Sequence, residues 1–521
     1  MRTERIGTHE RRRNHAPGQA SADALRDKFE ERATLDGELL LGNGFADIHT
    51  EVKTFHFDNR TPGERTEFLT YWSDLLLSGA PALAKETAPI RAALDGVGDR
   101  GQVLRALYYL GFAKRCEPIT TGRLFADAWG PEKTAAATAR QNELGAKLLA
   151  GADGLQAAAK DPFLQDRYRF QRMRLLFYTR RLPEARAYYA QNVGAFSGDS
   201  SVKHRFLAAA AGAFHREGDH GQANYLYSLV FDRFPPLKAS AFWSFHPMED
   251  GDWKKSLALA RSARERAVLW QLLGIHDDGP AAIEQIYAAD PASDLLPLLL
   301  VREVNKAEWD WWENLNRRRD EVGSGARESR SDAEAVGKRR VALVRRIADG
   351  KKALKPHLWQ IALAHLQAMS GDLKGAAAYL DLAERSMPRR PELAAQVRMS
   401  RLFARVRGLK GIDKAQEPYL ATELSWLATQ RQRPAEALRT WALGQLRGVY
   451  QKGGDGLRAL LLVDSRDADL YRDNRRIDEL VAFMARPGKS AFDQFLSANH
   501  PYSREQLLEL KGINDLYAGR F

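Results

Sequence analysis

The stretch Arg216–Pro236, REGDHGQANYLYSLVFDRFPP, contains the pattern that decides the fold. A Gly-Asp turn at 218–219 is followed by the small residue Ala223, five positions after the glycine. Tyr227 comes four residues later, Val230 three after that, and a proline closes the stretch. Spacings of three and four place these side chains on one face of a helix. The stretch therefore predicts a helix that follows another helix after a tight turn.

The same spacing recurs later in the chain. The turn Gly371-Asp372 is followed by Ala376, Leu380 and Ala383 at the same intervals, and by a proline five residues further on. Three looser copies have a comparable pattern: Leu182, Ala185 and Tyr189 after Tyr168–Tyr178; Ala281, Ala282 and Ile286 before Pro291; and Ala435, Ala437 and Trp441 after the turn at Arg431–Pro434. Recurrence of one spacing indicates a helix–turn–helix unit that is used several times.

This pattern resembles the tetratricopeptide repeat (TPR), a helix–turn–helix of about 34 residues. The small residue lets the second helix cross close to the first, and the large side chain fills the space toward the next unit. The resemblance covers roughly residues 160–521. It implies an all-α fold, an α–α superhelix built as a TPR-like solenoid of antiparallel helix pairs, with a binding surface on its concave side. A helical bundle without repeats is the alternative.

The composition of successive segments predicts four parts. Residues 1–60 are read as a basic tail and a short irregular segment, and 61–316 as a first helical-repeat block. Residues 317–338 are polar and contain Gly and Ser, which predicts a linker between two helical blocks. Residues 339–521 form the second TPR-like block.

The last repeat is predicted to be incomplete, with a first helix but no second one. The residues Ser503–Gln506 form a capping box that opens a final helix. Four later residues match the first helix and turn of another repeat: Leu508, Gly512, Gly519 and Phe521. A first helix alone cannot bury its inner face. We therefore expect the chain to be a fragment of a longer protein, or to be completed by another molecule.

The charge balance favours an acidic partner. The 521 residues include 79 Lys and Arg against 67 Asp and Glu, for a formal net charge of +12. Basic residues gather between 317 and 352, at Arg317–Arg319, Arg339-Arg340, Arg345-Arg346 and Lys351-Lys352. This patch predicts an acidic partner there. No sequence signature of a nucleic-acid-binding domain is present, so electrostatic binding of nucleic acid is kept only as an alternative.

No catalytic, cofactor-binding or metal-binding residue is predicted. The sequence has one cysteine, Cys116, which excludes an internal disulfide and cysteine-based zinc sites. We expect it to be a buried structural residue rather than a nucleophile. The tripeptide Gly488-Lys489-Ser490 lacks the first glycine of a phosphate-binding loop, where Phe483 stands, and it follows a predicted helix over Ile477–Met484.

Metal chemistry in the N-terminal region is the enzymatic alternative. Its candidate ligands are His49, His56 and Asp58, with Asp47, in a strand-like segment over Ile48–Phe57. These are suitable ligands for zinc or manganese and would support a metal-dependent hydrolase. Other clusters are read as structural. His215 and His220 are assigned to a turn and the surface, and a helix N-cap with a solvated face is assigned to Asp464, Asp467, Asp469 and Asp473.

Two aromatic groups are the candidate anchors for a partner. The first group brackets a His-Pro corner and comprises Phe242, Trp243, Phe245 and Trp253. The second group is Trp309, Trp311 and Trp312, which cannot all lie on one helix face. At least one of these tryptophans is expected between repeats, under the linker or on a partner surface. We expect the binding surface in the groove of the 200–390 region.

No apolar run approaches the ~20 residues that a membrane span needs, and the N-terminus lacks the apolar core of a signal peptide. The chain as written is therefore expected in the cytoplasm, or in the periplasm or outside the cell if its start is not the natural one. The sequence predicts a non-enzymatic helical-repeat scaffold that binds a protein or peptide through its concave surface, without a cofactor.

Overall fold

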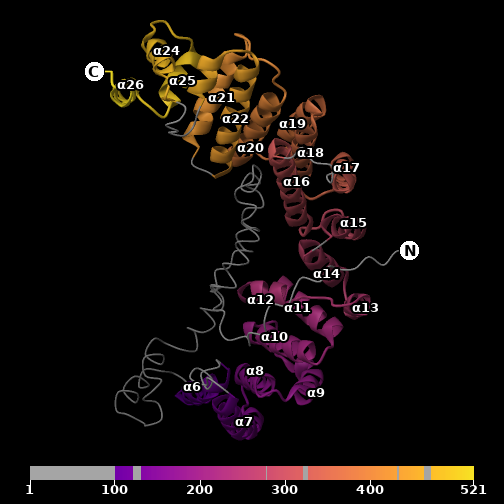
Figure 1. Cartoon of the computed structure of the whole chain (residues 1–521). Helices are drawn as coiled ribbons and strands as arrows, with labels where there is room; N and C mark the ends of the chain where they lie inside the picture. Colours follow the sequence, from indigo (N-terminus) through magenta and orange to yellow (C-terminus); the bar gives the residue numbers. More distant parts are fainter. Residues whose placement is uncertain are drawn as a thin grey trace. The chain divides into compact units, whose positions relative to one another are not determined.

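The computed structural model describes residues 100–120, 131–276, 278–320, 327–430, 433–462 and 471–520. Every regular element in these ranges is a helix, which confirms the all-α class (Figure 1). The predicted basic tail, the strand-like segment and the helix expected after Thr61 lie outside the described residues. The described residues form two compact units, which divide between Leu272 and Leu273.

The first unit contains α6 (Arg100–Thr120), α7 (Pro131–Ala158), α8 (Pro162–Tyr178), α9 (Leu182–Asn192), α10 (Ser201–Arg216), α11 (His220–Arg233), α12 (Lys238–Ser244) and α13 (Asp250–Leu259), with the short 3-10 helices η2 (Val193–Ala195) and η3 (Pro235–Leu237). The division between the units falls within α14 (Ala263–His276).

The second unit continues with α15 (Gly279–Ala289), α16 (Leu296–Asp320), α17 (Arg327–Gly350), α18 (Pro356–Ser370), α19 (Leu373–Ser386), α20 (Pro391–Arg407), α21 (Glu417–Thr429), α22 (Arg433–Lys452), α23 (Gly456–Leu461), α24 (Asn474–Ala485), α25 (Ala491–Asn499) and α26 (Arg504–Tyr517).

The two best sequence matches both fold as helix pairs joined by the same turn. Gly218 and Gly371 have φ angles of +79° and +94°, in the left-handed region that glycine adopts most easily. The backbone N–H of the following aspartate donates to a carbonyl five residues back, Asp219 to Phe214 at 3.0 Å and Asp372 to Gln367 at 2.9 Å. This is the Schellman geometry that ends a helix.

The same aspartates begin the next helix. The Asp219 carboxylate accepts from the backbone N–H of Gln222 at 3.1 Å, and that of Asp372 accepts from Gly375 at 3.0 Å. An aspartate at this N-cap position satisfies a backbone donor that the helix itself leaves unpaired. One Gly-Asp dipeptide therefore ends one helix and starts its partner, in α10–α11 and again in α18–α19.

The small and large residues of the repeat pattern lie where the pattern places them. Ala223 and Ala376 are completely buried at the start of their helices. The larger Tyr227 and Leu380 are also buried, and so are the residues three positions later. Helices α10 and α11 pack closely along each other, as do α18 and α19. The internal spacing read from the sequence is therefore the spacing of the packed helix face.

The first helices of successive pairs also contact each other. In the first unit α8 contacts both α6 and α10. In the second unit α16 contacts α18, α18 contacts α20, and α20 contacts α22. Figure 1 shows α6, α8, α10 and α12 along one side of the first unit, with α7, α9 and α13 along the other. Helices α8 and α18 therefore each pack on the helix that follows them and on the helices two positions before and after them.

The loop predicted over 317–338 is wrong wherever the structure describes that segment. Helix α16 continues to Asp320, and α17 already begins at Arg327. The prediction took polarity as a mark of a loop, but Arg, Glu and Ala are strong helix formers. The later part of α17 supplies the buried residues Leu343, Val344 and Ile347, so a polar helix start leads into an amphipathic helix.

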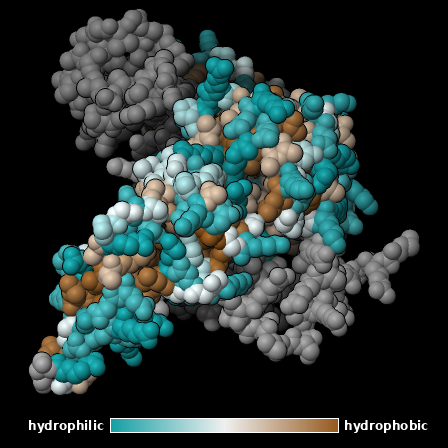
Figure 2. All heavy atoms as spheres, turned by 90° about the horizontal axis from the view of Figure 1, so that it is seen from above, coloured by the Kyte–Doolittle hydropathy of each residue, from teal (hydrophilic) through white to brown (hydrophobic). Residues whose placement is uncertain are grey.

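The last helix is only partly covered. In α26, Leu507 is completely buried, whereas Leu508, Leu516 and Tyr517 are 45%, 60% and 91% exposed. Figure 2 shows apolar side chains at the surface at the lower left, toward this C-terminal end, and at other places on the same face among hydrophilic ones. The predicted capping box is confirmed, with Ser503 and Gln506 each accepting from the other's backbone N–H.

The left-handed turn can be tested with two glycines that differ only in backbone conformation. A methyl group added at Gly371 or at Gly444, within α22, would meet open space. Only Gly371 has a positive φ, so Gly371→Ala should destabilise the protein by about 1–2 kcal/mol. The matched variant Gly444→Ala should stabilise it by about 0.5–1 kcal/mol. Urea unfolding of the full chain measures both changes, and equal effects of the two substitutions would contradict the turn assignment.

Candidate binding groove

An open groove of about 730 Å³ runs across the first unit. Its walls come from α6, α8, α10 and α12, with contributions from α11 and η3. These four helices follow one another along the same side of the unit (Figure 1). Each of the three long ones turns one stripe of side chains into the groove, at spacings of three and four residues.

The stripe on α8 gives the groove its chemistry. It consists of Arg167, Phe170, Gln171, Arg174, Phe177 and Tyr178. Helix α10 contributes mainly small side chains, with Arg205 as its only charged residue in the lining. The groove therefore has a wall of alternating guanidinium and aromatic groups beside a floor of small residues.

Close packing of α8 on α10 depends on Gly212. A Cβ atom at this position would lie 2.8 Å from the Phe177 ring, so the ring rests directly on the glycine backbone. The Arg216 guanidinium lies 4.1 Å from the centroid of the same ring, and the Tyr178 ring stands edge-on to it at 5.1 Å. A stack of backbone, ring and cation therefore forms one side of the groove.

The guanidinium of Arg174 has only neutral partners. It donates to the Thr120 hydroxyl at 2.8 Å and to the Gln171 side-chain carbonyl at 3.3 Å, and it lies 5.3 Å from the centroid of the Phe170 ring. Burial lowers the pKa of Arg174. Among the described residues no carboxylate pairs with it, so its charge is held at the groove without compensation.

Several arginines elsewhere in the described chain are matched by acids. Arg340 lies 2.8 Å from Glu303 and 3.0 Å from Asp310. Burial opposes its charge, but the hydrogen bonds and charges of these carboxylates raise the pKa of Arg340 overall. At Arg401 burial again opposes the charge, and the hydrogen bonds and charges of Asp381 and Glu384 raise the pKa of Arg401 overall. The direction of the shift at Arg174 is opposite because no such acid is present.

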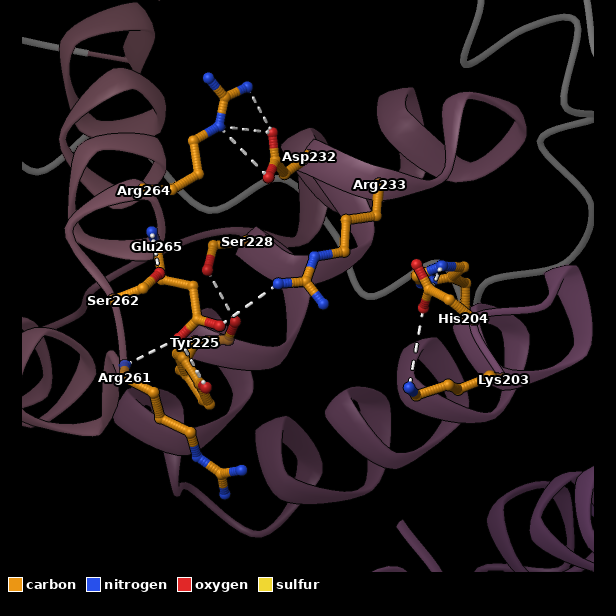
Figure 3. A network of polar contacts seen from close by, with 11 residues as sticks. Lys203, His204, Tyr225, Ser228, Asp232, Arg233, Arg261, Ser262, Arg264 and Glu265 are labelled. Carbon is orange, nitrogen blue, oxygen red and sulfur yellow. Dashed lines mark hydrogen bonds and ion pairs between the residues drawn. The ribbon is translucent and has the colours of Figure 1, made fainter. Parts of the chain in front are cut away.

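A buried carboxylate holds the helices behind the groove together (Figure 3). Glu265, near the start of α14, is 9% exposed. It accepts from the Tyr225 hydroxyl at 3.0 Å, from the Arg261 backbone N–H at 2.8 Å and from the Arg233 guanidinium at 3.4 Å. Figure 3 shows these groups converging on Glu265 from α11 and from the start of α14. This network joins α11 to the start of α14.

The predicted structural role of Cys116 agrees with its surroundings. The thiol lies in α6 and is completely buried. Burial raises the pKa of Cys116 to about 12, although the charges of Arg174 and Arg115 act in the other direction. At neutral pH the sulfur is therefore protonated and a poor nucleophile.

The His215–His220 pair lies at the turn, as predicted, but it is half-buried rather than on the surface. The two Nδ1 atoms are 3.2 Å apart, with the rings edge to face. Among the described residues, no group of three or more His, Cys, Asp or Glu side chains could hold a metal ion. The candidate ligands between Asp47 and Asp58 lie outside the described residues.

The tryptophans of the cluster at 309–312 lie on different faces of their helix, as their spacing predicted. Trp311 packs between helices, with its ring 5.7 Å from Phe403 of α20 and 6.2 Å from Trp441 of α22. Trp309 is 53% exposed. In the other group Phe242 and Phe245 are buried, and Trp253 packs edge-on against Trp270. The side chain of Trp312 is outside the described residues.

The basic patch around 317–352 is partly neutralised. Arg339 and Arg346 lie 3.7 Å and 3.2 Å from the carboxylate of Glu284, and Arg340 pairs with two acids. The side chains of Arg317–Arg319 lie outside the described ones. Part of the positive charge of this cluster is therefore paired with acidic side chains of the same chain.

Two smaller predictions are also settled. The segment before Gly488 is helical, in α24, and Ser490 is the N-cap of α25, so the tripeptide at 488–490 is a helix–helix junction. Asp473 is the N-cap of α24 as expected. The other acidic residues of that cluster, Asp464, Asp467 and Asp469, are outside the described residues.

The binding surface was expected between 200 and 390, and about half of the groove lining does come from residues 201–244, but the other half comes from α6 and α8. The signal that could have found it is the run RYRFQRMRLLFY over 167–178, in which arginine and aromatic residues recur on one helix face. No helix in the described part of the chain is long and apolar enough to span a membrane.

Comparisons with known proteins give no family for the chain. No family model matches it, and neither a curated protein nor a solved structure is significantly similar to it.

The Glu265 network predicts a large stability effect from one side chain. Glu265→Ala would leave the Tyr225 hydroxyl and the Arg261 N–H without their acceptor, so unfolding free energy should fall by about 2–4 kcal/mol. The nearby exposed pair Arg264–Asp232, at 2.8 Å, provides the control. Arg264→Ala should cost ~0–1 kcal/mol. Thermal unfolding of the two variants checks this, and a similar midpoint for both would show that Glu265 is not the hub.

Three histidines predict acid sensitivity. Burial lowers the pKa of His204, His215 and His500 below the ordinary value of 6.5. The unfolded chain therefore takes up protons at a higher pH than the folded chain, so folding stability is lost as pH falls below about 6.5. The thermal midpoint should drop as the pH falls from 7.5 to 5.5. The middle of this range lies roughly two pH units above the ordinary pKa values of carboxyl groups. His500→Gln should remove part of the drop, and an unchanged midpoint over this range would contradict the assignment.

Proposed function

We propose that the chain is a TPR-like solenoid that acts as a non-enzymatic scaffold and binds a protein or peptide segment in the groove of its first unit. The observation that carries the proposal is the convergence of three stripes, from α6, α8 and α10, on one groove. Stacked helix pairs present the equivalent face of each pair on the same side, which makes an extended surface for a polypeptide.

The side chains of the groove support this role. Tyr and Arg are enriched where interfaces gain most of their binding energy, and the groove holds Tyr109, Tyr178 and Tyr227 beside its arginines. Tyr178 is 36% exposed, and the floor offers the small side chains of Ala208 and Ala209. An incoming segment would find aromatic anchors at the wall and room at the floor.

The alternatives differ in where they act. A metal-dependent activity rests on residues 47–58, outside the described part. Electrostatic binding of nucleic acid would use the same excess of basic residues. A binding measurement with a single-stranded oligonucleotide, given with the groove variants below, distinguishes it from peptide binding. No observation on the groove favours either over a polypeptide.

A groove-filling variant tests the proposal. Peptides are selected from a random display library on the immobilised full chain, and their affinities are measured by fluorescence anisotropy. Ala209→Trp fills the floor with an indole and should weaken binding by about tenfold or more. The matched control is Ala187→Trp, an exposed alanine on α9, outside the groove lining.

Both variants should keep the helical circular dichroism of the parent chain. Selected peptides that bind the Ala209→Trp variant as tightly as the parent chain would place peptide binding elsewhere. A library that yields no binding peptide would overturn the proposed function.

A further inference from the structure

The groove carries an excess of positive charge from its own lining. Among the described lining residues the cations are Lys114, Arg167, Arg174 and Arg205, and the carboxylate is Glu117. The Lys114 ammonium lies 2.8 Å from Glu117, so these two charges largely cancel. Of the three arginines in the lining, Arg174 on α8 is the one whose hydrogen bonds all go to neutral groups among the described residues.

Arg174 is the clearest part of this excess. It is half-buried and its hydrogen-bond acceptors are a hydroxyl and an amide, whereas Arg340, Arg401 and Arg458 each contact two or three carboxylates. A desolvated guanidinium gains most from an ionised partner, because charge-assisted hydrogen bonds are about twice as strong as neutral ones. An anion that enters the groove would supply at Arg174 what acids of the chain supply to the other arginines.

The rest of the lining favours a polypeptide as the carrier of that anion. Between the arginines lie the apolar Val202, Ala209, Val230 and Leu237, which can receive aliphatic side chains. The exposed Ser240 of the lining offers a hydroxyl group that can both donate to and accept from a peptide backbone. A ligand with acidic side chains beside apolar ones matches both surfaces.

We infer that the groove of the first unit binds a polypeptide segment in which Asp or Glu side chains alternate with apolar ones, and that the Arg174 guanidinium pairs with one of the carboxylates. This inference rests on the proposed function and specifies its ligand. Arg205, on the facing helix α10, is placed to hold a second acidic side chain of the same segment.

The experiment uses the peptides selected on the full chain. Asp and Glu should be enriched in them relative to the input library, and replacing each acidic residue by Gln or Asn should weaken binding by about tenfold per critical carboxylate. The affinity of the acidic peptides should fall as salt rises, because the carboxylate–guanidinium contact is partly solvated.

Two variants on one helix assign the contact. Arg174→Gln should weaken acidic peptides by about tenfold and leave their Gln-substituted versions unchanged. The matched control is Arg172→Gln on the same helix, whose guanidinium is turned away from the groove and pairs with Asp153 beside the Tyr188 ring. If Arg174→Gln does not fold, Arg205→Gln provides the same comparison, and both are checked by thermal unfolding.

The outcomes separate the inference from the proposed function. Selected peptides that lose binding to Ala209→Trp but carry no acidic enrichment would keep the function and overturn the inference. Acidic peptides that respond equally to Arg172→Gln and Arg174→Gln would overturn it as well. A labelled single-stranded oligonucleotide that binds more tightly than the peptides, with the same loss on Arg174→Gln, would replace the peptide by nucleic acid.

Discussion

The architecture depends on a junction of two residues between paired helices. A left-handed residue turns the chain back and a carbonyl five residues earlier is satisfied by the next backbone N–H. The aspartate that supplies this N–H then caps the following helix. Both halves act on backbone groups that a helix end would otherwise leave unpaired. The junction is therefore short, and it allows the two helices to pack directly, as in α10–α11 and α18–α19.

The same Gly-Asp junction occurs at a position that the repeat pattern did not predict. Gly454 has a φ angle of +80°, the Asp455 N–H donates to the Tyr450 carbonyl at 2.9 Å, and the Asp455 side chain caps α23. Ala459, five residues after this glycine, is buried. At Arg180 the left-handed conformation is adopted by a residue other than glycine, with φ of 59°. The geometry is thus retained even where the sequence signal has weakened.

This explains how much of the fold was predictable. Gly-Asp turns, capping boxes and small residues at fixed spacing act over a few residues, so they can be read from sequence. Polarity misled the prediction over 327–338, since solvated helices are as polar as loops. The groove could be located only in part, because its lining combines residues 201–244 with α6 and α8, and the way separate helices face one another is set by packing rather than by any one segment. Arg174 stands out only once its neighbours are known to be neutral.

Net charge is a poor guide to a binding surface for a related reason. The basic cluster around Arg339–Arg346 is partly balanced by Glu284, Glu303 and Asp310 in the folded chain. In the groove, by contrast, Arg174 meets hydroxyl, amide and aromatic groups. The free energy available for an anionic ligand depends on the charge left uncompensated after folding and on how far it is desolvated. One half-buried guanidinium group with neutral neighbours, that of Arg174, therefore matters more for recognition than a longer run of basic residues whose charges the fold has partly matched.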